Sequence, residues 1–189
     1  MSSFGKDIIM VGYAGLNGSA KLASSYNKDR LPKTIITRLQ ELSAWEEKLL
    51  EDDQLLILIN NIASEESDIV YPASKGGVFR GLWNMAEELK TGLTVYLENI
   101  SIKQETIEIC EEYDVNPYML YSPGVVLVVS DKGNGLVREF NRAGLHSNVI
   151  GFTTNTKDRI IVSGDEKRYI ESRIQEELER IGMSERSVD

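Results

Sequence analysis

The amino-acid sequence predicts an α+β fold, in which a mixed β-sheet is covered by helices. Segments with helical periodicity and β-branched apolar segments follow one another without the strict alternation of a parallel βαβ protein. One segment, Val125–Val129, is continuously apolar, as expected of a central strand that is buried on both faces. The length of 189 residues suits one domain whose core needs no disulfide or metal ion.

Two short strands with three helices between them are expected before the glycine-rich turn of the chain. Ser19 follows the turn Gly15–Gly18 and is a candidate helix cap. Pro32 suits the start of a longer helix, in which apolar residues recur on one face. An apolar segment after that helix fits a helix or a strand, and we favour a helix. The expected elements are Ile8–Val11, Ser19–Tyr26, Pro32–Leu49, Leu55–Ala63 and Ile69–Tyr71.

The rest of the chain contains further segments, some with the periodicity of a helix and some with that of a strand. Leu82 and Trp83 belong to the apolar face of an amphipathic helix, so we expect Trp83 in the core. Pro117 stops a later helix, and Gly144 ends another. Glu166 begins a final helix with an apolar stripe. The expected elements are Phe79–Leu89, Leu93–Leu97, Gln104–Tyr113, Val125–Val129, Asn134–Gly144, Asn148–Phe152, Arg159–Val162 and Glu166–Ile181.

The charge balance excludes some classes of partner. A net charge of −9 argues against nucleic acid, because phosphate contacts need clustered Lys and Arg. The acidic runs Glu46–Asp53 and Glu105–Asp114 are typical of solvated helix faces. No apolar run reaches the ~20 residues of a membrane span, and no signal-peptide pattern is present. We therefore expect a cytoplasmic protein without a membrane partner.

Single cysteine and histidine residues limit the chemistry that the chain can offer. Cys110 is the only cysteine and lies on an apolar helical face, which predicts a buried, inert thiol in a reducing compartment. His146 is the only histidine and follows Gly144-Leu145, which predicts a surface imidazole. One histidine cannot form a metal cluster, so we predict no metal site.

The most informative stretch is Tyr71–Leu89, where the polar turn Ser74-Lys75-Gly76-Gly77 runs directly into an amphipathic helix. Glycines at a helix start let backbone N–H groups approach a ligand, and the helix dipole favours an anion there. The turn is therefore a candidate phosphate or anion site. The alternative is a glycine turn that only connects two elements.

The segments around this turn resemble, in order, a known family. They include SIKQETIEICEEYDVNPYMLYSPGVVLVV, GNGLVREFNRAG and NVIGFTTNTKDRIIVSGDEKRYIE. Together with the segment Asp7–Ala23 they are similar to the C-terminal domain of the AIR synthase-related superfamily. That superfamily includes aminoimidazole ribonucleotide synthetase, selenophosphate synthetase, thiamine-monophosphate kinase and a hydrogenase maturation factor, and the last is the most similar.

The resemblance implies a fold and a domain plan. It implies a three-layer arrangement, partly like a ferredoxin fold, over residues 1–182. Residues 1–66 would be a strand and helical lead-in, residues 67–182 the main sheet with its helices, and residues 183–189 a frayed tail. Full-length relatives carry an N-terminal ATP-binding domain before the segment that resembles Asp7–Ala23. The resemblance thus implies a C-terminal domain that stands alone.

The resemblance also implies where family chemistry is incomplete. The segment Tyr71–Gly77 resembles the family pattern H-D-x-T-x-G-G, but Pro72 takes the acidic position and offers neither a metal ligand nor a proton. Ser122-Pro123-Gly124 resembles a family turn of the form S-S-G, so Ser122 and Gly124 join the candidate ligand-binding residues, with a structural turn as the alternative. The chain ends SERSVD and lacks the cysteine-bearing tail of the hydrogenase maturation factors.

Three functions follow as alternatives. The first is a binding or partner module that is catalytically incomplete and uses no cofactor alone. The second is one half of an ATP-dependent ligase or dehydratase, in which an N-terminal ATP-binding partner domain supplies the site for ATP and Mg²⁺. The third is a sensor of a small anion. Because the family's N-terminal domain covers one side of this domain, we expect a homodimer or such a partner.

Overall fold

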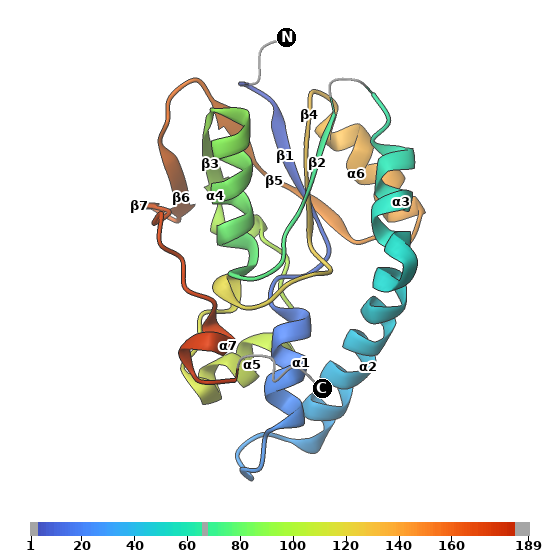
Figure 1. Cartoon of the computed structure of the whole chain (residues 1–189), viewed down its shortest axis with the longest axis vertical. Helices are drawn as coiled ribbons and strands as arrows, with labels where there is room; N and C mark the ends of the chain where they lie inside the picture. Colours follow the sequence, from blue (N-terminus) through green and yellow to red (C-terminus); the bar gives the residue numbers. More distant parts are fainter. Residues whose placement is uncertain (1–3, 66–67, 184–189) are drawn as a thin grey trace.

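The computed structural model describes residues 4–65 and 68–183 and contains a mixed seven-stranded sheet with helices on both faces (Figure 1). This architecture confirms the predicted α+β class. The strands are β1 (Asp7–Val11), β2 (Ile69–Pro72), β3 (Gly92–Tyr96), β4 (Val126–Ser130), β5 (Ser147–Thr154), β6 (Arg159–Ser163) and β7 (Glu166–Tyr169). The α-helices are α1 (Leu16–Ser24), α2 (Lys33–Leu50), α3 (Gln54–Ile62), α4 (Gly77–Leu89), α5 (Gln104–Tyr113), α6 (Gly133–Arg142) and α7 (Glu177–Arg180). Short 3₁₀ turns lie at η1 (Glu51–Asp53), η2 (Leu97–Asn99) and η3 (Pro117–Met119).

The strand order is β2-β4-β1-β5-β3-β6-β7, so the N-terminal strand lies between two strands from the second half of the chain. β1 pairs antiparallel with β4 and with β5. β3 and β6 form the parallel pair of the sheet. As predicted, β4 is a fully buried strand with neighbours on both sides. Strand β2 is at the sheet edge, where Pro72 is tolerated because an edge strand leaves some N–H positions unpaired.

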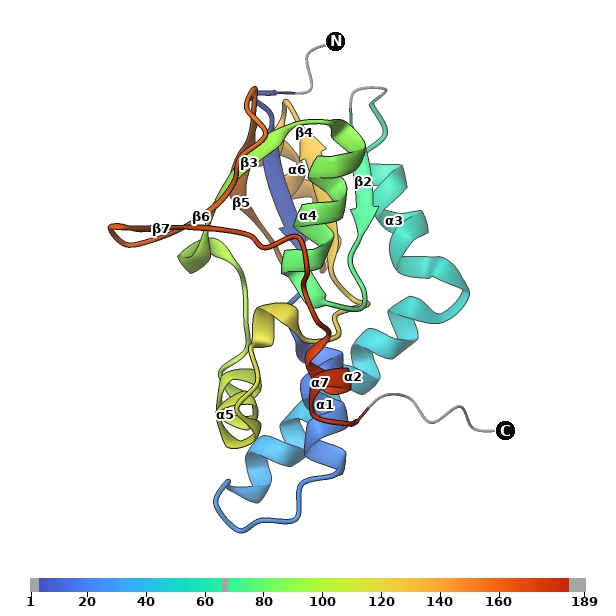
Figure 2. The same cartoon turned by 60° about the vertical axis from the view of Figure 1, so that its left-hand side comes forward.

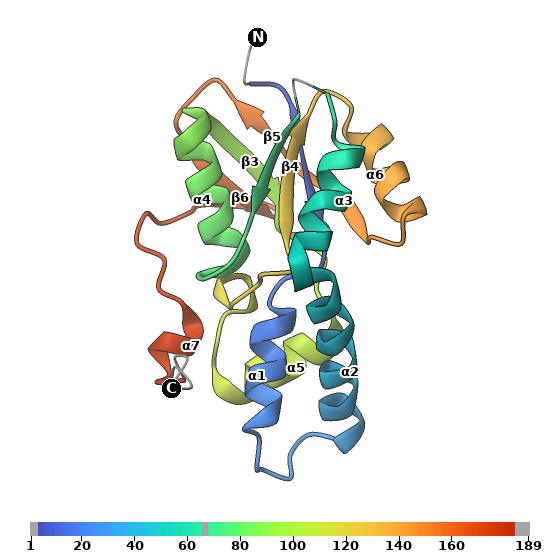
Figure 3. The ribbon, with the colours of Figure 1, turned by 45° about the vertical axis from the view of Figure 1, so that its right-hand side comes forward.

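Two hydrophobic cores sandwich the sheet. Alternate residues of β1 show the principle, since Ile8 and Met10 pack with α4 on one face, whereas Ile9 and Val11 face α3 and α6. Figure 3 shows the sheet between α4 on one side and α3 with α6 on the other. The result is the three-layer arrangement that the resemblance implied.

A third core lies at one end of the sheet, where α1, α2, α5 and α7 gather (Figure 1). Leu39 and Cys110 are buried there, as predicted for an inert thiol. Burial, followed by the charge of Glu177, raises the pKa of the Cys110 thiol to about 12. Within the described part of the chain, none of the helices is long and apolar enough to cross a membrane.

Among the described residues, one face of the sheet at β3 and β6 stays partly exposed, and we call it the open sheet face. Cross-strand neighbours on it are Phe152, Thr94, Ile160 and Tyr169, and their accessibility contrasts with the buried Leu93, Val95 and Ile161 of the opposite face. Phe152 is 38% exposed and Tyr169 is 70% exposed. The β6–β7 hairpin projects away from the helices (Figure 2).

The start of the first helix differs from the prediction. Helix α1 begins at Leu16 and follows Gly15, whose φ of 69° places it in the left-handed region. Ser19 is therefore not the cap but a residue inside the helix, where its hydroxyl donates to the Leu16 carbonyl at 2.8 Å. The four-residue turn that the sequence predicted is replaced by one left-handed glycine.

The predicted final helix is wrong. Ser163 and Glu166 form a cross-strand pair, and the two residues between them, Gly164-Asp165, make a hairpin turn. The chain then runs irregularly, and helix appears only at Glu177–Arg180. The residues predicted to form its apolar stripe are nevertheless mostly buried, namely Ile170, Ile174 and Leu178. We call residues 170–176 the strap. Of the predicted tail, residues 184–189 lie outside the described residues.

Candidate functional site

The glycine turn adopts the backbone expected before a helix that starts abruptly. Gly76 caps α4 with a φ of 77°, and Gly77 has a φ of 61°. A Cβ on Gly77 would lie 2.5 Å from the carbonyl oxygen of Tyr118. Glycine is thus required at residue 77, both for its backbone angles and because α4 approaches the backbone of η3 closely.

The start of α4 already holds an anion that belongs to the chain. The backbone N–H of Gly76 donates to Oε2 of Glu176. The other carboxylate oxygen, Oε1, accepts from the N–H groups of Tyr121 at 2.9 Å and Leu178 at 3.3 Å. Glu176 is 6% exposed, so this carboxylate is buried against the positive end of the helix dipole. An external anion would have to displace it.

The other predicted site residues divide into two places. Ser122 lies at the glycine turn, where its N–H donates to the Ser74 carbonyl at 3.2 Å. Its hydroxyl donates to the Leu120 carbonyl at 2.7 Å and accepts from the Gly15 N–H at 2.8 Å, so it is used within the fold. Lys75 is exposed, with Nζ 3.9 Å from Glu179 Oε1. Gly124 lies elsewhere, against Glu46.

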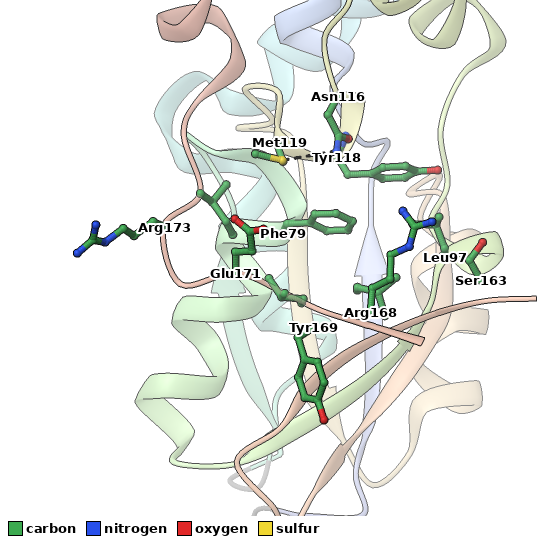
Figure 4. A pocket seen from close by; sticks show the side chains of 13 residues that line it. Phe79, Leu97, Asn116, Tyr118, Met119, Ser163, Arg168, Tyr169, Glu171 and Arg173 are labelled. Atoms are coloured by element: carbon green, nitrogen blue, oxygen red, sulfur yellow. Dashed lines mark hydrogen bonds between the residues drawn. The ribbon is translucent and has the colours of Figure 1, made fainter. Parts of the chain in front are cut away.

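A cavity of about 520 Å³ opens beside the turn, between the first turn of α4, η3, β7 and the strap (Figure 4). We call it the β7 cavity. Its lining combines apolar and aromatic side chains with a few charged groups. It is lined by Phe79, Leu97, Asn116, Tyr118, Met119, Ile161, Ser163, Arg168, Tyr169, Ile170, Glu171, Arg173 and Ile174.

Aromatic and cationic groups face each other in the β7 cavity. The rings of Phe79 and Tyr118 stack with centroids 5.3 Å apart and planes 13° from parallel. Burial raises the pKa of the Tyr118 hydroxyl, which therefore stays neutral. Figure 4 shows the Arg168 guanidinium directed toward Tyr118, whereas the Arg173 guanidinium points away. Arg168 also pairs with Glu166 at 2.6 Å, with both side chains exposed.

The surroundings of Trp83 and of His146 refine predictions made from the sequence. Trp83 packs against the sheet core but is only partly buried, and the Arg159 guanidinium lies 3.7 Å from its ring centroid. His146 is also partly buried rather than a surface imidazole. It stacks on Tyr13 with ring centroids 4.6 Å apart, and burial, followed by the Lys103 charge, lowers its pKa.

Sequence reasoning missed the buried carboxyl groups of Glu46 and Glu176, as well as that of Glu177, which is 5% exposed. Glu176 escaped notice because the strap was assigned to a helix. Glu46 was assigned to a solvated acidic face, but it is 3% exposed. Its position three residues after Ser43 and seven after Leu39, which are also buried, would have placed it on the inner face of α2. Among residues 4–65 and 68–183, no three His, Cys, Asp or Glu side chains are grouped to hold a metal ion.

The three-layer sheet with an appended helical end defines a class: the chain has the AIR synthase-like fold. No family model matches it, and no curated protein is similar in sequence. Escherichia coli HypE, a hydrogenase maturation protein, is similar over 96% of this chain and 53% of its own, with 16% identity and a TM-score of 0.69. T. maritima PurL complexed with ATP is similar over 89% of this chain and 25% of its own, with 14% identity and a TM-score of 0.57. Thiamine monophosphate kinase from Aquifex aeolicus is similar over 87% and 52%, with 14% identity and a TM-score of 0.54.

These similarities establish the fold and its extent. The chain spans about half of the length of the HypE chain that it matches. Identities of 14–16% are too low to transfer an activity, so the function rests on the chain's own side chains.

Proposed function

We propose that the chain is a binding module whose ligand carries a flat ring and an acidic group and binds in the β7 cavity. The observation that carries this proposal is the stacked pair of Phe79 and Tyr118 with the Arg168 guanidinium directed toward it. A cavity of about 520 Å³ lies within the range of small-molecule sites, about 300–1,000 Å³.

The physical contributions are of the right size for reversible binding. An aromatic contact contributes about 0.5–1.5 kcal/mol beyond burial of its area, and a hydrogen bond to a charged group about 1.5–3 kcal/mol. A micromolar complex requires about 8 kcal/mol. Burial of the ligand's apolar surface against Leu97, Ile161 and Ile170 supplies the remainder in this proposal.

Catalysis lies outside this proposal for the chain by itself. Pro72 stands where the resembling family has an acidic residue, and Glu176 occupies the start of α4. ATP and Mg²⁺ enter the proposal only through a second domain that would supply their ligands. A free small-anion sensor at Ser74–Gly77 would require Glu176 to leave its three N–H donors.

Benzoate and benzamide make a matched pair of probes, because they share a ring and differ in charge. Isothermal titration calorimetry should show that benzoate binds more tightly than benzamide. Arg168→Gln should remove this preference, and Arg173→Gln, whose guanidinium points away from the cavity, should leave it intact. Equal binding of the two probes to the unmodified chain, or no effect of Arg168→Gln, would refute the proposal.

A second candidate function is docking to another protein domain or to a second copy of the chain. The open sheet face favours it, because partly exposed aromatic and aliphatic side chains form a continuous cross-strand row there. Among similar structures, one is a HypE–HypF complex, and HypE and PurL have been solved with ATP. We infer that a partner on this face would complete a composite site that neither half holds alone.

Docking through the open sheet face can be tested with one substitution and one control. Phe152→Arg should abolish association in sedimentation equilibrium, because it replaces the apolar ring at the β5 end of the row with a charge. Ile57→Arg should have no effect, since Ile57 is also exposed, at 55%, but lies on α3. Two results together would reject this candidate. The unmodified chain would have a monomeric mass at all concentrations, and a pull-down would recover no partner whose binding is lost in Phe152→Arg.

A further inference from the structure

A second cavity, separate from the β7 cavity, surrounds a buried acid on α2. Glu46 is 3% exposed, and its Oε2 atom has no hydrogen-bond partner among the described residues. The nearby hydroxyl of Ser43 is directed to Glu47 instead. A buried carboxyl oxygen without a donor is unfavourable, because its lost hydration is not replaced. In its ionised form the carboxyl group therefore presents an acceptor oxygen that lacks a donor.

The surrounding backbone makes room for this carboxyl group. A Cβ on Gly124 would lie 2.0 Å from Cδ of Glu46 and 2.3 Å from Oε1, so a side chain at residue 124 would displace the carboxyl group from this place. Asn17 lies close enough to hydrogen bond with Glu46, and its own Oδ1 is buried without a partner. The unpaired Oε2 of Glu46, whose side chain lines the cavity, is an acceptor that suits an N–H donor of a ligand.

The cavity beside Glu46 measures about 180 Å³ and has a cationic side. Lys103 lines it, with Nζ 3.9 Å from the centroid of the Tyr13 ring. His146, which also lines the cavity, stacks on the Tyr13 ring, and its Nε2 lies 2.7 Å from Ser101 Oγ. Ser101 Oγ also accepts from the side-chain amide of Asn148, and burial, followed by the Lys103 charge, lowers the pKa of His146, which favours its neutral form.

We propose that this cavity binds a small zwitterion, whose ammonium group donates to Glu46 and whose carboxylate pairs with Lys103. Acid and base line one small cavity, and its volume admits only a molecule of a few heavy atoms. Trp45, 52% exposed, stands at the rim and provides an aromatic wall for the ammonium end. This site does not depend on the β7 cavity, so the two proposals can fail independently.

Binding should be coupled to a proton. Desolvation by burial, offset by hydrogen bonding to Asn17 and assisted by the charge of Glu47, raises the Glu46 pKa from 4.5 to about 7. The other titratable groups that line the cavity are Tyr13, Lys103 and His146. An ammonium group favours the ionised carboxylate, so the carboxyl proton leaves to the buffer when the ligand binds. At about pH 6 the release should approach one proton per ligand, and at about pH 8.5 it should vanish.

Calorimetry in buffers of different ionisation enthalpy measures both affinity and proton release. The probes are glycine, β-alanine, γ-aminobutyrate and δ-aminovalerate, which differ in the spacing of their charges. We expect one of them to bind at least tenfold more tightly than propylamine or acetate, each of which carries one charge. Glu46→Gln should abolish binding and proton release, whereas Glu47→Gln, one residue along α2 and exposed, should retain both.

Lys103→Met separates the two ends of the ligand. It should weaken the best zwitterion toward the affinity of propylamine and leave propylamine unchanged. Thermal unfolding of each variant verifies that it is folded. The proposal is overturned if none of the four probes binds with a Kd below about 10 mM. It is overturned equally if a probe binds to Glu46→Gln as tightly as to the unmodified chain, or without proton release at about pH 6.

Discussion

At the scale of single residues, Glu46 is the side chain whose burial is most unusual for its residue type. It occupies the inner face of α2 with Leu39 and Ser43. Helical spacing placed it there, although glutamate is among the residues least often fully buried. The neutral form lowers the cost of this placement, which is why the pKa of the Glu46 carboxyl rises to about 7.

Glu46 should make the chain less stable as the pH rises. Its pKa is 4.5 in the unfolded chain and about 7 in the folded chain, so the folded state holds a proton that the unfolded state loses in this interval. Stability is full below about pH 4.5 and falls as the pH rises to about 7, by about 3 kcal/mol in total. Glu46→Gln should remove this slope in urea unfolding measured across the pH range. An equal slope in the Gln variant would contradict the assignment, and Glu47→Gln is the control.

Cys110 should be unreactive in the native protein. Its thiol is 2% exposed, and burial raises its pKa to about 12, so almost no thiolate exists at neutral pH. Ellman's reagent at about pH 8 should react only as fast as the chain unfolds globally, and at once in denaturant. A rapid reaction without denaturant would show that the helical end opens by itself.

At the scale of elements, the strap and the start of α4 act as one unit. The Glu176 carboxylate joins the N–H groups of Gly76, Tyr121 and Leu178, which come from separate segments of the chain. The helix start thereby gains an anion without a ligand, and the strap is fixed beside the β7 cavity. Sequence distance hid this contact, because 100 residues separate Gly76 from Glu176.

Glu176→Ala should destabilise the chain by about 2–4 kcal/mol, since it leaves buried N–H donors without an acceptor. Hydrogen exchange at Gly76 and Tyr121 should accelerate most. Glu179→Ala is the matched control on the same segment. Its side chain is half exposed and 3.9 Å from Lys75, and such surface pairs contribute about 0–1 kcal/mol. Equal losses of stability in the two variants would show that the Glu176 contacts stabilise the chain no more than an exposed ion pair does.

The strap also shows why periodicity alone misassigned the last element. Ile170, Ile174 and Leu178 recur every four residues, and this spacing places side chains on one side of a helix and also of an extended chain. Burial of the stripe was therefore predictable, but its conformation was not. The two-residue turn Gly164-Asp165 was the local signal for a hairpin. Elements with longer periodic runs were predicted better. Both ends of α2 were predicted within one residue, and both ends of α5 were predicted correctly.

Only part of the candidate site was predictable. The turn at Gly76 and Gly77 follows from glycine chemistry and the helix that comes after it. Neither Arg168 in the β7 cavity nor Glu46 beside Gly124 could be assigned from spacing, because tertiary packing brings each to its neighbours from a distant segment. Whether Ser74, Lys75 and Ser122 contact a ligand stays a prediction.

At the scale of the whole molecule, net charge discriminates between the two kinds of partner. Two copies of a chain with a charge of −9 repel each other, so added salt should strengthen a homodimer on the open sheet face. A basic partner would instead be released by salt. Sedimentation equilibrium at about 0.05 M and about 0.5 M salt shows whether salt strengthens or weakens the association. Association that weakens with salt in the purified chain would contradict a homodimer held by apolar contacts.

The position of β1 has a consequence for synthesis on the ribosome. Val11 is synthesised about 115 residues before its partner Val126, and the other neighbour, β5, follows later still. At about 5–20 residues per second, translation leaves this apolar segment unpaired for on the order of ten seconds. An unpaired strand of this kind is a target for nascent-chain chaperones. Strand β1 therefore completes its pairing only after β4 and β5 have been made.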